Sequence, residues 1–214
     1  MKDFKKWHYA TISKKVIEAL NKNHFEAFYV DNKEEARKKV LSLIEKGASI
    51  GLGGSITLME MGIIDDLRSG DYVLYDRYDP NLTPAELVEV FRKSMLADYF
   101  LTGTNAITLD GKLVNIDGRG NRVAAMIYGP KKVIVVAGAN KIVKNVDEAL
   151  SRIGMVAAPR NAERLDRNTP CRELGYCIDC NSKDRMCSFT TIIGKQELTP
   201  NRITVILVGE DLGF

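Results

Sequence analysis

Apolar and polar positions follow two periods along this chain, and together they predict alternating helices and strands. Apolar residues recur at helical spacing in four segments, at residues 5–23, 31–46, 55–68 and 145–153. Short apolar runs between glycine or polar residues predict strands at residues 25–30, 49–52, 72–75, 99–102, 133–137 and 203–208. Repeated strand–helix units are typical of a mainly parallel sheet with helices on both faces. We therefore expect an α/β fold.

Local signals indicate where two helices begin. Asp31 is followed three residues later by Glu34, and Thr83 is followed in the same way by Glu86, which is the spacing of a capping box. Pro84 adds a first-turn proline to the second of these starts. The sequence thus predicts one helix that begins at Asp31 and another that begins at Thr83.

An antiparallel hairpin is predicted in the middle of the chain. Asp110-Gly111 separates apolar runs at residues 107–109 and 113–116. An Asp-Gly pair between such runs favours a two-residue turn in which both residues have positive φ. The sequence shows no internal repeat, low-complexity tract or interdomain linker. Residues 1–214 are therefore predicted to form one domain, with a cysteine-bearing loop at residues 170–188 near its C-terminal end.

Charge and hydropathy exclude several classes of partner. The 31 basic and 28 acidic residues are mixed along the chain and give a net charge of +3. A nucleic-acid-binding protein would gather its basic residues on one face, so we expect no nucleic-acid partner. No segment is apolar for long enough to cross a bilayer, and charged residues interrupt the first 20 residues, unlike a signal peptide. We expect a cytoplasmic protein whose thiols stay reduced.

All four cysteines of the chain fall within 17 positions, with the spacing C-x5-C-x2-C-x6-C: Cys171, Cys177, Cys180 and Cys187. Thiolates this close repel one another, and a bound cation or iron–sulfur cluster would offset that repulsion. The two-residue gap lets two neighbouring thiolates ligate one centre. Two disulfides are the alternative, which a reducing compartment disfavours. Spacing alone leaves zinc and an iron–sulfur cluster open.

A glycine turn follows the strand predicted at residues 49–52. Gly53-Gly54-Ser55-Ile56-Thr57 leads into a helix, where free backbone N–H groups and two hydroxyl groups can bind phosphate or carboxylate. The segment is neither a dinucleotide fingerprint nor a P-loop. A plain turn capped by Ser55 is the alternative.

Glu60 follows the glycine turn by about one helical turn. If one helix runs from Ser55 to Arg68, Glu60 projects within its apolar arc. A buried carboxylate is costly unless it is paired or used, so Glu60 is the candidate acid or base. A structural ion pair with an arginine is the alternative.

Basic side chains in two further loops could reach the same ligand. Arg119 lies between two glycines and is followed by Asn121 and Arg122, and guanidinium groups bind carboxylate and phosphate bidentately. Lys141 follows the apolar strand at residues 133–137, where open α/β sheets bind ligands. Each of these residues could instead be a solvent-facing loop charge. If the two loops converge with the glycine turn, an anion site is the better interpretation.

Several of these segments together resemble the lactate-utilisation (LUD) domain family. The resemblance is carried by residues 53–57 with Glu60 and Gly62, residues 102–117, residues 120–130, Asn140-Lys141 and residues 208–213. It implies a fold similar to those of ribose-5-phosphate isomerase, glucosamine-6-phosphate deaminase and the CoA transferases. In that superfamily the glycine turn and the loops at the hairpin end line a site for phosphorylated sugars or acyl groups.

The same resemblance implies a role in lactate oxidation through complexes that contain iron–sulfur subunits. It therefore favours an iron–sulfur cluster over zinc at the four cysteines. Our first hypothesis is a redox accessory protein that binds a small anionic metabolite and carries this centre. The alternatives are a sugar-phosphate isomerase or CoA/acyl transferase with structural zinc, and a non-catalytic metabolite-binding module. Homo-oligomerisation is left open. The predicted ligand-binding residues are Gly53, Gly54, Ser55, Thr57, Asn105, Arg119, Asn121, Arg122 and Lys141.

Overall fold

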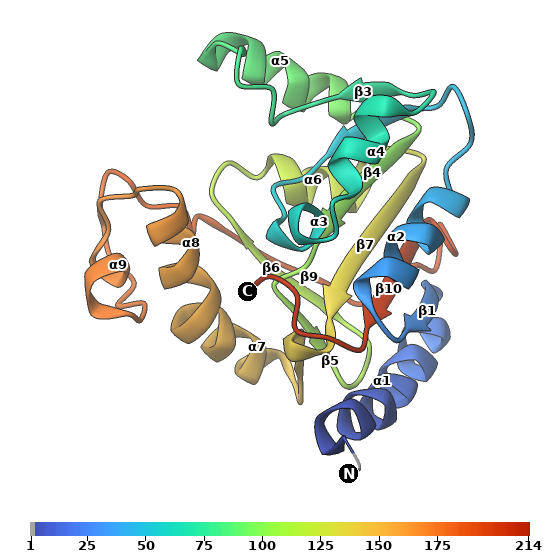
Figure 1. The fold of residues 1–214 in the computed structure, drawn as a ribbon. Helices are drawn as coiled ribbons and strands as arrows, with labels where there is room; N and C mark the ends of the chain where they lie inside the picture. The colour runs from blue at the N-terminus through green and yellow to red at the C-terminus, as the bar shows by residue number, and fades with distance from the viewer. Residues whose placement is uncertain (1–2) are drawn as a thin grey trace.

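Six parallel strands form the larger sheet of the computed structural model, which describes residues 3–214 (Figure 1). The strand order is β1-β10-β7-β4-β2-β3, and every neighbouring pair is parallel. The bounds are β1 (Glu26–Val30), β2 (Ser49–Leu52), β3 (Val73–Tyr75), β4 (Tyr99–Gly103), β7 (Lys132–Gly138) and β10 (Ile203–Val208). These are the six strands predicted from short apolar runs. Residues 1 and 2, the start of the segment compared with a signal peptide, lie outside the described residues.

A second, mixed sheet of four strands lies beside the first, in the order β8-β5-β6-β9. Its strands are β5 (Ala106–Thr108), β6 (Leu113–Asp117), β8 (Ile142–Val143) and β9 (Phe189–Ile193). The antiparallel pair β5–β6 confirms the predicted hairpin. Its turn differs from the prediction, because Lys112 O accepts from Thr108 N at 3.0 Å and only Gly111 has positive φ, at 77°. One left-handed glycine therefore closes a three-residue loop.

Helices cover both faces of the larger sheet, as predicted. Their bounds are α1 (Phe4–Lys22), α2 (Lys33–Ser42), α3 (Ile56–Glu60), α4 (Ile63–Ser69), α5 (Pro84–Ser94), α6 (Asn121–Tyr128), α7 (Val146–Arg152), α8 (Ala158–Arg164) and α9 (Pro170–Leu174). A 3₁₀ turn, η1 (Ala139–Lys141), follows β7, and a π-helical turn, η2 (Ile153–Ala157), joins α7 to α8. Helix α1 runs along the lower edge of the molecule in Figure 1.

Two predicted helix positions need correction. Helix α2 is capped by Asn32, whose side chain accepts from Glu35 N, and not by Asp31. The predicted helix at residues 55–68 is two helices, α3 and α4, because Gly62 adopts a left-handed conformation with φ of 68° between them. A residue in that conformation cannot continue a right-handed helix. The capping box of Thr83 and Glu86 is confirmed at the start of α5.

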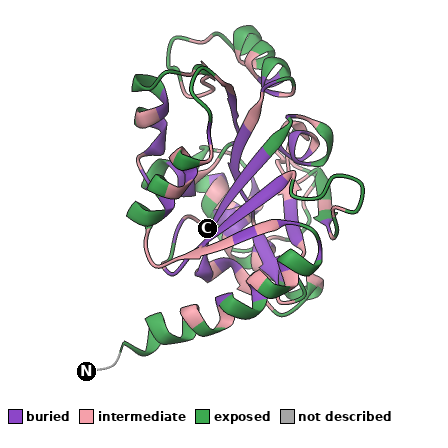
Figure 2. Ribbon diagram, turned by 90° about the vertical axis from the view of Figure 1, so that its right-hand side faces the viewer, coloured by how far each residue is buried: buried purple, intermediate pink, exposed green. Residues whose placement is uncertain are grey.

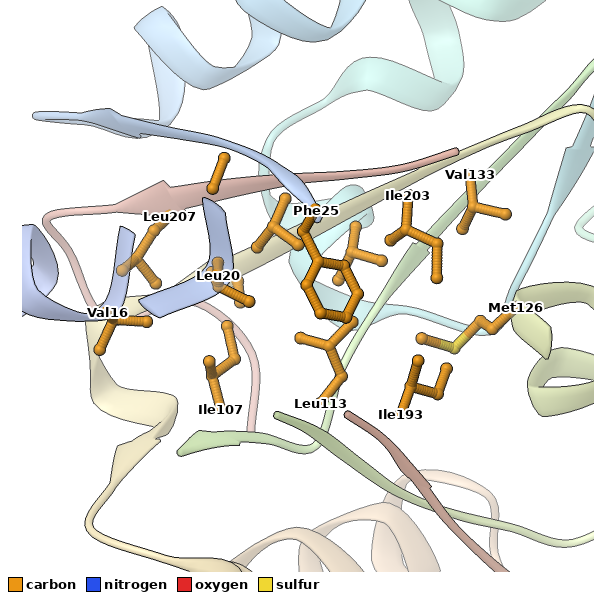
Figure 3. Close-up of a cluster of buried hydrophobic side chains, with 14 of the residues drawn as sticks. Val16, Leu20, Phe25, Ile107, Leu113, Met126, Val133, Ile193, Ile203 and Leu207 are labelled. Carbon is orange, nitrogen blue, oxygen red and sulfur yellow. The ribbon is translucent and has the colours of Figure 1, made fainter. Parts of the chain in front are cut away.

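The larger sheet is buried on both faces, as the purple strands in Figure 2 show. Alternate residues of β7 and β10 point to opposite sides, so Val135 and Val205 belong to one core and Ile134 and Ile206 to the other. The first core lies between the two sheets and includes side chains from α1 and α6 (Figure 3). The second core packs the sheet against α2, α3 and α4. These two layers hold the carboxyl ends of the strands in place.

Candidate functional site: an arginine-lined pocket

A pocket of about 360 Å³ opens where several parallel strands end. The turns after β2, β4 and β7 supply Gly54 and Ser55, Thr104 and Asn105, and Lys141 to its wall. The loop after β6, helix α8 and the segment before β9 complete the wall. The carboxyl ends of strands are the usual ligand site of an open α/β sheet. The volume falls in the range of pockets that bind small molecules.

Positive charge dominates this pocket. Its wall contains a single acidic side chain, Asp117, and six basic ones: Arg77, Arg119, Arg122, Lys141, Arg164 and Arg167. Asp117 directs one carboxylate oxygen toward backbone N–H groups of α6, accepting from Arg122 N at 3.1 Å and Val123 N at 3.2 Å. That carboxylate is thus committed to the start of the helix. The excess of cations favours an anionic ligand.

Arg122 is the buried centre of the wall, with 8% of its surface exposed. Its guanidinium donates to neutral oxygens: Asn115 Oδ1 at 2.6 Å, Asn105 Oδ1 at 3.1 Å, and the backbone oxygens of Gly103 and Ile116. Burial is the main cause that lowers the pKa of Arg122, and the charge of Asp117 opposes this effect. Because its contacts are neutral, the positive charge of Arg122 adds to the field of the pocket.

Arg77 lines the pocket beside Gly54 of the glycine turn. Its guanidinium carbon is 4.8 Å from the ring centre of Phe91, and the guanidinium carbon of Arg119 is 5.9 Å from the same ring centre. Burial is the largest cause that lowers the pKa of Arg77, and the charges of Arg164 and Arg119 act in the same direction. Three guanidinium groups therefore crowd one side of the pocket, where an anion would relieve their repulsion.

Arg167 contributes an unpaired donor. Its Nε is buried and has no hydrogen-bond partner among the described residues. Buried donors normally have a partner, and an unsatisfied one indicates a place where a water, an ion or a ligand binds. Arg167 lines the pocket, so this donor supports an anion there.

Lys141 lies at the inner end of the pocket, where η1 follows β7, and only 3% of its surface is exposed. Its Nζ donates to Thr57 Oγ1 at 3.0 Å. Burial, and then the charges of Arg152 and Arg122, lower the pKa of Lys141 from 10.5 to about 7, whereas Glu60 opposes the shift. The surroundings of this amine therefore favour its neutral form more than water does.

The glycine turn reaches the pocket only in part. Gly54 and Ser55 line it, whereas Gly53 and Thr57 are buried and lie outside the lining. Ser55 Oγ accepts from Leu58 N at 3.3 Å, and Ser55 N donates to the hydroxyl of Tyr78 at 3.0 Å. Helix α3 has five residues. Its N-terminal N–H groups are therefore already partly paired, and the side-chain cations dominate the electrostatics of the pocket.

Glu60 is exposed, so the expectation that it is buried within an apolar arc is wrong. The arc assumed one continuous helix, whereas α3 ends at Glu60. Glu60 Oε2 instead accepts from Gly213 N at 2.7 Å and so holds the C-terminal segment against α3. Glu60 does not line the pocket. Its role as acid or base remains a prediction from the sequence.

The comparisons with known proteins address the family. The LUD domain matches residues 13–208 of this chain. The chain belongs to the LUD domain family. That family is linked to lactate utilisation. No curated protein gave a match.

The fold of this LUD protein also occurs among solved structures. A DUF162 family protein from Deinococcus radiodurans superposes with a TM-score of 0.52 at 20% identity, over 94% of this chain and 98% of that chain. The delta subunit of eIF2B from Chaetomium thermophilum gives a TM-score of 0.35 at 20% identity, over 56% of this chain and 50% of that chain. The first of these similarities shows that the two chains share a fold.

The four-cysteine loop of this LUD protein meets the pocket at one point. Met186 and Cys187 form part of the pocket wall, and Cys187 also lines a second cavity with Cys177. Arg185 fixes the loop by donating to the backbone oxygens of Cys187, at 3.1 Å, and of Cys180. The sequence did not indicate whether this loop lies near the predicted ligand site. The structure places its last cysteine, Cys187, in the wall of the pocket.

All four cysteines of the LUD protein are free thiols, so the two-disulfide alternative is not realised. Burial, followed by the charge of Cys177 and more weakly those of Cys171 and Cys180, raises the pKa of Cys187, whereas the charge of Arg185 opposes this shift. Four thiols suit zinc or an iron–sulfur cluster chemically. Within residues 3–214, however, no three Cys, His, Asp or Glu side chains converge as an ion would require.

Seven of the predicted residues meet in the pocket of the LUD protein: Gly54, Ser55, Asn105, Arg119, Asn121, Arg122 and Lys141. Three further arginines of the pocket were not predicted from the sequence. Arg77 lies in the loop after β3, Arg164 is the last residue of α8, and Arg167 follows that helix. These arginines have no motif around them.

No helix within residues 3–214 is both long and apolar enough to cross a membrane.

Proposed function

We propose that this LUD protein binds a small anionic metabolite in its arginine-lined pocket and acts as a redox accessory protein in lactate utilisation. Six basic side chains and one already committed carboxylate carry the proposal, since such a wall favours a ligand with at least one carboxylate or phosphate group. The volume of about 360 Å³ suits a small metabolite.

The redox part of the proposal rests on the four-cysteine loop. We propose that Cys171, Cys177, Cys180 and Cys187 hold a metal centre, preferably an iron–sulfur cluster, with iron–sulfur subunits as partners. An iron–sulfur cluster supplies electron transfer when it is bound. The position of Cys187 in the pocket wall supports a functional connection between the loop and the ligand. To ligate one centre, the four sulfurs have to be drawn closer together than the described residues place them.

Two measurements test this function. Calorimetric titration with L-lactate, pyruvate and inorganic phosphate should detect binding of at least one anion, which is lost in a variant that combines Arg77→Leu with Arg164→Leu. Purification without oxygen should give brown protein that contains iron and acid-labile sulfide. Colourless protein with one zinc would overturn the redox role and favour an isomerase or acyl transferase. Protein that binds none of the three anions would overturn the ligand-binding role.

A further inference from the structure

The side chain of Lys141 has fewer partners than a charged lysine requires. A protonated amine carries three N–H donors. Within residues 3–214 the structure gives its Nζ one hydrogen-bond acceptor, Thr57 Oγ1, and no ion pair. Thr57 in turn donates to Leu212 O at 3.3 Å. Because 3% of the lysine is exposed, bulk water cannot supply the missing acceptors.

The charged groups around Lys141 also disfavour an ammonium ion. Arg152 approaches from α7 and Arg122 from α6, and both guanidinium charges repel a protonated amine. Glu60 of α3 attracts it more weakly than these groups repel it, and the exposed carboxylate of Glu60 already accepts from Gly213 N. A lysine that is buried beside other cations is the arrangement that activates an amine as a nucleophile.

From this arrangement we propose that Lys141 is a nucleophile that forms an imine with the carbonyl group of an anionic metabolite bound in the pocket. This inference rests on the proposed function, because the arginines would hold the anionic group of the same molecule. It narrows the ligand class to anionic carbonyl compounds, such as 2-oxo carboxylates.

The step balances without an oxidant or reductant. The lone pair of Lys141 Nζ attacks the carbonyl carbon, a C–N bond forms, and the C–O π bond breaks to give a carbinolamine once a proton moves from nitrogen to oxygen. Loss of the hydroxyl group with a second proton from nitrogen releases one water and leaves the C=N bond. Arg122 and Arg152 disfavour the positively charged, protonated imine for the same reason that they disfavour the ammonium ion. We therefore expect the neutral imine to dominate above neutral pH.

Reductive trapping tests the proposal directly. The protein is incubated with pyruvate, and sodium borohydride is then added to reduce any imine irreversibly to a secondary amine. Peptide mass mapping should place one adduct per chain on Lys141 within minutes, whereas the exposed Lys144 of the same segment reacts at least tenfold more slowly. The adduct should disappear in Lys141→Arg and persist in Lys144→Arg. Its rate should rise as pH passes through 7, because the neutral amine is the reactive form.

Titration of pyruvate without borohydride separates imine formation at Lys141 from anion binding in the pocket. Pyruvate that binds but leaves Lys141 unlabelled would overturn the nucleophile and keep the anion pocket. Labelling spread evenly over exposed lysines would overturn the nucleophile as well. If pyruvate neither binds nor labels, dihydroxyacetone phosphate serves as the second probe, and failure of both carbonyl anions overturns the inference. The pocket itself then falls only if phosphate also fails to bind.

Discussion

Arg122 Nη1 donates a 2.6 Å hydrogen bond to Asn115 Oδ1, and this contact joins helix α6 to strand β6 inside the pocket wall. The same guanidinium reaches Asn105 Oδ1 in the loop after β4. One buried cation therefore connects strand β6 of the second sheet to the carboxyl end of strand β4 in the first sheet.

Replacing Arg122 should therefore destabilise the whole fold. Arg122→Met removes the charged donor that Asn105, Asn115 and two backbone oxygens share, and we expect a loss of about 2–4 kcal/mol in the free energy of unfolding. Arg122→Lys should rescue little of it, because one amine cannot reach four acceptors held in a planar arrangement. Urea unfolding followed by circular dichroism measures both. A loss below about 1 kcal/mol for Arg122→Met would show that its contacts contribute little.

Arg77 and Arg164 should affect ligand binding without affecting the fold. Each Arg→Leu variant removes a cation that repels its neighbours, so we expect unchanged or slightly higher stability. Phosphate affinity should fall about tenfold for each variant, since about 1.4 kcal/mol corresponds to a factor of ten. Arg92→Leu is the matched control, because Arg92 is exposed and pairs with Glu89 on the outer side of α5. Equal affinities in all three variants would contradict the pocket.

Lys141 should make stability depend on pH above neutrality. Its pKa is lowered to about 7 in the folded chain from 10.5, so between these values the unfolded chain binds more protons. Stability then rises with pH through this window, and below pH 7 the contribution is constant. We expect the difference in unfolding free energy between Lys141→Met and the unmodified chain to shrink by a few kcal/mol from pH 7 to pH 10.5. A difference that does not vary with pH would mean that the buried amine is charged.

Glu60→Gln separates the predicted acid–base role from the contact that the structure shows. The amide keeps an oxygen that can accept from Gly213 N, so the C-terminal segment should stay in place and global stability should change by less than about 1 kcal/mol. Hydrogen exchange at Gly213 measures the contact. Retained turnover of an identified substrate would eliminate Glu60 as the base, whereas lost turnover with unchanged ligand affinity would support it.

The larger sheet could be predicted from the sequence because its strands are buried on both faces. A fully buried strand such as β10 is an uninterrupted apolar run, which few other structures produce. The second sheet was only half predicted. Phe189 and Ile192 of β9 are exposed, so that strand has no clear apolar period. Helix α6 was missed for a different reason, because it begins directly after the polar residues of the predicted anion loop.

The sequence predicts where the pocket lies in the fold, but it does not predict all the side chains that line it. Lys141 was found because it follows a buried strand, and the carboxyl ends of parallel strands meet at one edge. Arg77 and Arg164 lie in segments far apart in the sequence, and only tertiary packing brings them together. Glu60 was misplaced because a left-handed glycine, Gly62, ends the helix that would have buried it. No hydrophobic period reveals such a break.

Met186 and Cys187 belong at once to the cysteine loop and to the pocket wall. Through these shared residues, ligand binding in the pocket and chemical modification of the cysteine loop can affect each other's free energy. If oxidation, metallation or alkylation of the loop changes the affinity for the ligand by some factor, the bound ligand must change the equilibrium of that modification by the same factor. Occupancy of the pocket can thus be read from the chemistry of a thiol, without an assay of turnover.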